Sequence, residues 1–270
     1  MVKRKRKQSS KKSIFDKPAL TSFVDANGWK TGHVKNFYRV VRKQATIENT
    51  TVSEFERDVV EALSKENSFP KDMIEKIFES FQVFSTKMVK SYVSKDGTVM
   101  MLVRTHDDHK VECVLIPHSN RSTCCVSSQI GCAMGCKFCA TGTMGILGDL
   151  HYSEILEQLM YAKIFNKNRG RLNCVFMGMG EPLRNYENVR DTVLGMIDQD
   201  LFGMARRHIT VSTVGVIENI KRLTKDLPGV SLALSLHAAT QSKRESIVLS
   251  AKAYPLEKLM NAMDNNFRAC

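Results

Sequence analysis

Apolar residues recur every three to four positions between residues 21 and 86. That spacing predicts amphipathic helices, because it places the apolar side chains on one helix face. Ser53 and Glu56 have the spacing of a capping box, and Pro70 is expected to open a later helix. We therefore expect residues 21–86 to form a small helical N-terminal domain, preceded by a disordered basic tail of residues 1–20.

The apolar spacing shortens to every second residue after Met88, which predicts strands. Turn sequences at residues 95–97 and 106–108 divide this stretch into three short strands, so residues 87–117 are expected to form a β-meander. Strand and helix patterns then alternate four times. Four β-α units predict a parallel sheet, and the fold class expected for residues 118–270 is α/β.

Small and polar residues follow three of the four predicted parallel strands. The three groups are Gly178–Pro182, Ser212–Thr213 and Ser235–His237. The carboxyl ends of parallel strands meet at one edge of a sheet, and ligands bind there in βα folds. We therefore expect the three groups to line one pocket, although each group alone is a weak signal.

Charge and hydropathy narrow the classes of protein that fit. The chain of 270 residues carries a net charge of +12, of which the first twelve residues contribute seven cations. The remaining residues carry a net charge of +5. This charge would favour binding to a polyanion such as RNA, but it would also serve solubility alone. No apolar run reaches the length of a membrane span, and the N-terminus lacks a secretory signal. A cytoplasmic protein is the default expectation, with nuclear import through residues 3–7 and organellar targeting left open.

Six of the eight cysteines lie between residues 113 and 139, and three of them form a CxxxCxxC run at Cys132, Cys136 and Cys139. Three thiolates at this spacing can bind a metal centre. A structural zinc ion needs a fourth ligand and usually a second cysteine or histidine pair, which the sequence does not supply. A 4Fe-4S cluster held by three cysteines leaves one iron open, so the spacing favours iron–sulfur over zinc. Phe138 either stacks on an aromatic cofactor or packs within the loop.

An aromatic residue before the third cysteine makes this run resemble the radical S-adenosylmethionine (SAM) signature, and GMGEP at 178–182 resembles the GGEP-type motif of that superfamily. The longer strings CVSSQIGCAMGCKFCATG, VFMGMGEPLRNY, ITVSTVGV and LALSLHA are similar to the RlmN/Cfr family of RNA adenine methyltransferases. The resemblance runs from about Val111 to the last predicted helix and continues more weakly into the helical region.

The resemblance implies a role for each matching residue. Cys132, Cys136 and Cys139 would hold a 4Fe-4S cluster, whose open iron chelates SAM. The other SAM contacts that it implies are Gly180 and Glu181 at the amino end, and Ser212, Ser235, Leu236 and His237 along the rest. Cys125 matches a catalytic cysteine that resolves a covalent protein–RNA intermediate, and Glu112 matches a general base. Cys113, Cys124 and Cys174 have no such match and are expected to be buried or spare thiols.

In that family, one SAM methylates a cysteine near the C-terminus and a second SAM is cleaved reductively to a 5′-deoxyadenosyl radical. The carbon radical formed on the methyl-cysteine then adds to C2 or C8 of an adenine. The resemblance therefore implies ribosomal or transfer RNA as substrate, 4Fe-4S and SAM as cofactors, and an electron donor of the flavodoxin or ferredoxin type.

The sequence departs from the family pattern after its fourth β-α unit. The methyl-carrying cysteine of the family lies in an ACGQ-type motif beyond a fifth and a sixth unit, and Cys270 is not followed by Gly-Gln. We therefore expect an incomplete radical SAM partial TIM barrel from a C-terminally truncated chain, with its fourth parallel strand at an edge. Three hypotheses stay open: a radical SAM RNA methyltransferase, a non-catalytic isoform that binds the cluster, SAM or RNA, and a zinc-stabilised RNA-binding protein.

Overall fold

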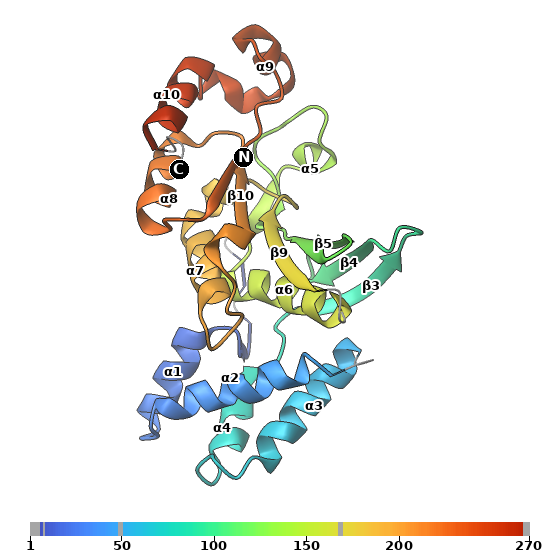
Figure 1. Ribbon diagram of the computed structural model, residues 1–270, viewed down its shortest axis with the longest axis vertical. Coiled ribbons are helices and arrows are strands. Elements are labelled where there is room, and N and C mark those ends of the chain that lie inside the picture. The colour runs from blue at the N-terminus through green and yellow to red at the C-terminus, as the bar shows by residue number, and fades with distance from the viewer. Residues whose placement is uncertain (1–5, 8, 48–50, 167–169, 267–270) are drawn as a thin grey trace.

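A computed structural model describes residues 6–7, 9–47, 51–166 and 170–266 of the chain. Four helices gather at one end of the molecule, as Figure 1 shows. They are α1 (Lys17–Ala26), α2 (Gly32–Gln44), α3 (Val52–Lys65) and α4 (Met73–Ser80). Each buries one apolar face, such as Phe55, Val59 and Leu63 on α3, so the periodic pattern predicted these helices correctly. Cys270 lies outside the described residues.

The basic N-terminal segment is more ordered than we expected. Lys12–Ser13 forms β1, which pairs in parallel with β2 (Phe81–Gln82), and α1 begins at Lys17 rather than after residue 20. The Asp16 carboxylate accepts the backbone N–H of Ala19, which caps α1. The segment is ordered because Ile14 and Phe15 are fully buried and fix it to the core. The expectation of a disordered tail is therefore wrong for residues 9–20.

Two helix starts also differ from the expectation. The capping box of α3 uses Thr51 and Glu54 rather than Ser53 and Glu56. Both pairs have the same spacing, so the local sequence allowed either start. Helix α4 begins at Met73 after Asp72, whose φ of 64° turns the chain, and not at Pro70.

One seven-stranded sheet forms the rest of the framework, in the order β11-β10-β9-β6-β5-β4-β3. Its parallel half consists of β6 (Arg121–Cys125), β9 (Arg171–Phe176), β10 (Ile209–Thr213) and β11 (Ser231–Leu234). Its antiparallel half is the expected meander, β3 (Lys87–Val93), β4 (Val99–Arg104) and β5 (Lys110–Pro117). Strand β5 pairs with β6, so the meander extends the same sheet and is not a separate linker.

Helices follow the four parallel strands, as the alternating pattern predicted. They are α6 (Tyr152–Asn166), α7 (Tyr186–Ile197), α8 (Ile217–Asp226) and, after α9 (Gln241–Ile247), α10 (Leu256–Asn266). A short hairpin of β7 (Gln129–Gly131) and β8 (Ile146–Asp149) encloses α5 (Ala140–Thr143). None of the helices in the described ranges is both long and apolar enough to span a membrane.

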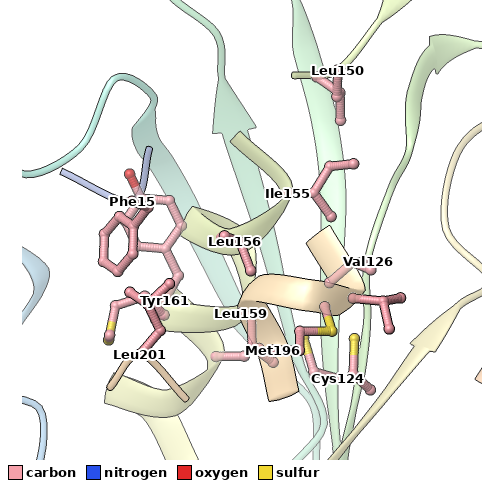
Figure 2. Close-up of a cluster of buried hydrophobic side chains, with 14 of the residues drawn as sticks. Phe15, Cys124, Val126, Leu150, Ile155, Leu156, Leu159, Tyr161, Met196 and Leu201 are labelled. Atoms are coloured by element: carbon pink, nitrogen blue, oxygen red, sulfur yellow. The ribbon is translucent and has the colours of Figure 1, made fainter. Parts of the chain in front are cut away.

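The sheet buries only one of its faces in the main core. Alternate residues of the strands, among them Cys124, pack against α6 and α7, and Figure 2 shows this cluster with Leu156, Leu159 and Met196. The intervening residues, such as Val114, Cys125 and Val175, are half-buried. Strand alternation therefore gives the sheet a covered face and an open face. Cys124 and Cys125 are neighbours in sequence but lie on different faces.

Candidate functional site

The three cysteines of the CxxxCxxC run lie in the loop between β7 and β8. The backbone N–H of Cys132 donates to Gly145 O at 2.8 Å, and that of Cys139 donates to Cys136 O at 3.1 Å. Gly131 has a φ of 78°, and a Cβ there would lie 2.0 Å from Gly145 O. A Cβ on Gly142 would lie 2.7 Å from Cys136 O. Glycine is therefore required for the loop to fold tightly around its cysteines.

Apolar side chains surround the cysteine loop. Cys136 is 7% exposed and packs with Met134, Val214, Val248 and Ala251. The backbone N–H of Lys137 donates to Ile247 O at the end of α9. This segment after β11 therefore packs against the loop and covers Cys136.

Burial weakens the acidity of two of the three thiols, Cys132 and Cys136. It raises the pKa of Cys132 to about 11. Burial, Cys139 and Glu181 together raise the pKa of Cys136. A metal centre would supply the positive charge that the thiolates need.

Three cysteines in one loop fit a 4Fe-4S cluster. A structural zinc ion usually takes four protein ligands. In a 4Fe-4S cluster each thiolate binds a different iron, so three cysteines suffice and the fourth iron stays open.

Phe138 and His237 connect the cysteine loop to the end of β11. Their ring centroids are 4.5 Å apart with a 55° tilt, and Phe138 is 56% exposed. His237 has a φ of 63°, a left-handed conformation that a non-glycine residue seldom adopts. Burial, and then the nearby Arg244, lower its pKa, so the imidazole is neutral at pH 7. The two predicted residues therefore meet at one border of the site.

Ser212 and Ser235 form the next part of the same border. Ser212 is on β10, and its Oγ lies 3.1 Å from Ser235 Oγ, just after β11. The backbone N–H of Ser235 donates to Thr213 O, and that of Leu236 donates to Leu234 O. The structure thus brings the end of β10 and the residues after β11 together, as the strand-end argument predicted.

Glu181 and Gly180 make close contacts with neighbouring segments of the chain. The Glu181 carboxylate accepts the backbone N–H of Leu183 at 3.0 Å and of Val214 at 2.9 Å. Burial raises its pKa, although these hydrogen bonds oppose the shift. Gly180 has a φ of 98°, and a Cβ there would lie 2.5 Å from Gln129 Cβ. Glu181 therefore fixes the loop after β9 to the end of β10 in this structure.

Cys125 and Glu112 lie on the open face, on neighbouring strands. Cys125 pairs with Val114 of β5, and Glu112 lies two residues from Val114 on the same face. Glu112 is exposed, and its backbone oxygen accepts Ser127 Oγ at 2.6 Å. Burial raises the pKa of Cys125 to about 11.

The remaining thiols are separate from this site. Cys113, Cys124 and Cys174 are fully buried on the covered face, with Cys113 Sγ 3.6 Å from Cys124 Sγ. They are the buried thiols that we expected.

Arg244 is a residue that the sequence pattern did not indicate. Its side chain is completely buried and donates to three carbonyl oxygens, those of Leu236, Tyr254 and Val214. Burial lowers its pKa, and Cys136 partly opposes this shift. The guanidinium therefore joins the loops after β10 and β11 and places a positive charge near the cysteine loop. An arginine in a polar helix looks solvent-exposed from sequence, so only the fold identifies it.

Comparison with known proteins agrees with this geometry. A family model described as the radical SAM superfamily matches residues 126–269. The structure is similar to the crystal structure of a radical SAM methyltransferase from Sphaerobacter thermophilus, with a TM-score of 0.84 and 30% sequence identity. That match covers 95% of this chain and 72% of the other chain. The fold and the cysteine loop therefore define a radical SAM protein.

Two relatives narrow the class further. The probable dual-specificity RNA methyltransferase RlmN 2 of Protochlamydia amoebophila is 36% identical over 93% of this chain and 67% of its own length. The dual-specificity RNA methyltransferase RlmN of Rhodopseudomonas palustris strain BisB5 is 40% identical over 74% of this chain and 54% of its own length. The chain belongs to the RlmN-type family of radical SAM RNA methyltransferases, and it spans about half to two thirds of the length of these curated relatives.

Proposed function

We propose that this chain carries the cluster and SAM site of an enzyme that methylates C2 of an adenine in ribosomal or transfer RNA. The observation that supports the proposal best is the contact between Phe138 of the cysteine loop and His237 after β11. This contact closes a border around an apolar loop of three cysteines at the carboxyl ends of parallel strands, where ligands bind in such sheets.

The residues present have distinct roles in this proposal. Cys132, Cys136 and Cys139 would hold a 4Fe-4S cluster that, with SAM bound, supplies the one-electron cleavage of SAM to a 5′-deoxyadenosyl radical. The hydroxyl groups of Ser212 and Ser235 would bind polar groups of SAM, and the Phe138 and His237 rings would cover it. Gly180, Glu181 and Leu236 would hold the surrounding loops in position.

Cys125 and Glu112 would act on the RNA side of the site. At neutral pH the Cys125 thiol is protonated, since its pKa is about 11, so it must lose this proton to act as a nucleophile. The exposed Glu112 carboxylate on the neighbouring strand is a base that could accept a proton on the same face. We further propose a flavodoxin- or ferredoxin-type electron donor and a cytoplasmic location.

The test is anaerobic reconstitution of the chain with iron and sulfide, followed by SAM and a strong reductant. We expect about four iron atoms per chain and formation of 5′-deoxyadenosine. Cys136→Ser should lose both. Cys125→Ala, the matched control outside the loop, should keep both. Stoichiometric zinc in place of iron would overturn the proposal.

A second assay separates the enzyme from a non-catalytic isoform, which the partial coverage of the relatives keeps as an alternative. Reconstituted chain is incubated with transfer or ribosomal RNA, and the digested RNA is analysed for 2-methyladenosine by mass spectrometry. The modified base is expected from an active methyltransferase. Formation of 5′-deoxyadenosine without 2-methyladenosine would favour the non-catalytic isoform.

A further inference from the structure

The open face of the sheet has a strongly uneven charge. Its seven strands contain one acidic residue, Glu112, and six basic residues. Strand alternation and register place all seven on the open face, opposite to the main core. The six are Lys87, Lys90, Arg104, Lys110, Arg121 and Arg171.

Lys90, Arg104 and Lys110 form a strip on β3, β4 and β5. Lys90 pairs with Leu102, Leu102 pairs with Glu112, and Arg104 pairs with Lys110. Within the described residues, no carboxylate lies within ion-pair distance of Lys90 or Lys110. Arg104 approaches Asp108 at 3.3 Å, but both side chains are exposed, and such a pair is weak. The strip therefore has positive charge available for an anionic partner.

Tyr92 adds an aromatic surface to the strip. Its side chain is 47% exposed, and Lys90 Nζ lies 4.4 Å from the centre of its ring. An exposed aromatic ring beside an ammonium group can stack on a nucleobase while the cation binds a phosphate. An aromatic ring combined with a cation therefore indicates a nucleic-acid strand more specifically than positive charge alone does.

The strip leads directly to the candidate catalytic residues. The register places Tyr92, Met100, Val114 and Cys125 in one row across β3, β4, β5 and β6. Three strand spacings separate Tyr92 from Cys125, which is about 14 Å. A few nucleotides can span that distance, so one RNA strand could reach both residues.

We infer that the open face of β3, β4 and β5 binds the single-stranded RNA next to the reacting adenine. Tyr92 stacks on a base, while Lys90, Arg104 and Lys110 bind phosphates. The inference rests on the proposed function, because Cys125 and Glu112 mark where the adenine would lie. It adds the surface and the residues that hold the rest of the strand.

The experiment measures binding of a fluorescent, unstructured RNA of about 16 nucleotides to the full chain at several salt concentrations. Each lost phosphate contact lowers the slope of log K against log salt by about 0.7. Lys90→Ala/Lys110→Ala should therefore reduce the slope by about 1.4. The control is Lys221→Ala/Lys225→Ala, which removes the same charge from the exposed side of α8 and should leave the slope unchanged.

Two further variants test the aromatic contact. Tyr92→Ala should weaken RNA binding at least about fivefold without changing the slope, and Tyr92→Phe should bind as the parent chain does. Equal slopes for both lysine double variants would overturn the inference. Unchanged binding by Tyr92→Ala would also overturn it, since the strip would then be a general polyanion surface that also accepts heparin.

The 5′-deoxyadenosine assay on the same samples separates this inference from the proposed function. A chain that cleaves SAM but does not bind the RNA contradicts the inference and leaves the radical chemistry intact. A chain whose RNA binding depends on Lys90, Lys110 and Tyr92 but that cleaves no SAM supports the inference and contradicts the proposed function.

Discussion

Arg244 holds three carbonyl oxygens from separate loops with one guanidinium group. A planar group with five N–H donors suits this arrangement, whereas the ammonium of lysine is a single point of charge. The carbonyls belong to the ends of the segments that border the cysteine loop. Arg244 therefore links these loops to one another by hydrogen bonds, as backbone pairing links the strands of the sheet.

Replacement of Arg244 by Met should lower the free energy of unfolding by about 3 kcal/mol, because three buried carbonyl oxygens lose their donor. Urea unfolding of the two proteins at pH 7 would measure the difference. Lys243→Met, at the exposed neighbouring position, is the control and should unfold as the parent chain does. Equal loss in both variants would contradict the role assigned to Arg244.

At the scale of single elements, the sequence predicted those helices and strand ends that local residue patterns determine. The helical spacing gave α3 and α4, and the strand-end residues gave the meeting of Ser212 with Ser235. The pairing of β5 with β6 was not predicted, because pairing between a meander and a parallel sheet depends on contacts outside both patterns. Arg244 was missed for the same reason, since its partners lie in three segments.

Helix α6 is fixed to the segment before β3 by a buried carboxylate. Glu157 accepts the backbone N–H and hydroxyl groups of both Ser85 and Thr86. Glu157→Gln should lower the free energy of unfolding by about 1–3 kcal/mol. The amide NH2 of glutamine would replace an oxygen that accepts hydrogen bonds, and it would then face N–H and O–H donors. Urea unfolding measures this loss. Glu257→Gln, on the exposed side of α10, should have no comparable effect.

At the scale of the whole molecule, Arg6 joins the N-terminal segment to two distant parts of the chain. Its guanidinium donates to Asp107, in the turn between β4 and β5, and to Glu154 on α6. All three side chains are at most 13% exposed. Burial opposes ionisation of Glu154, but hydrogen bonds from His106 and Arg6 lower its pKa to about 2. Similar contacts lower the pKa of Asp107.

Arg6→Ala should lower the free energy of unfolding at pH 7 by about 3 kcal/mol, since it removes the guanidinium that binds both buried carboxylates. A carboxylate with a depressed pKa stabilises the fold above its ordinary pKa, and this contribution is lost as the pH falls toward its folded value. The difference between the two proteins should therefore shrink between about pH 4.5 and pH 2. A difference that stays constant over this range, in urea unfolding at each pH, would contradict the assignment.

The two adjacent cysteines of β6 differ in accessibility, and this difference depends on the register of the strand. Cys124 is fully buried among other thiols, whereas Cys125 is only half-buried on the open face. A shift of β6 by one residue against β5 would exchange the two, because side chains alternate along a strand. Labelling with a thiol reagent therefore reports the alignment of this strand, because it shows which of the two neighbouring cysteines, Cys124 or Cys125, is accessible.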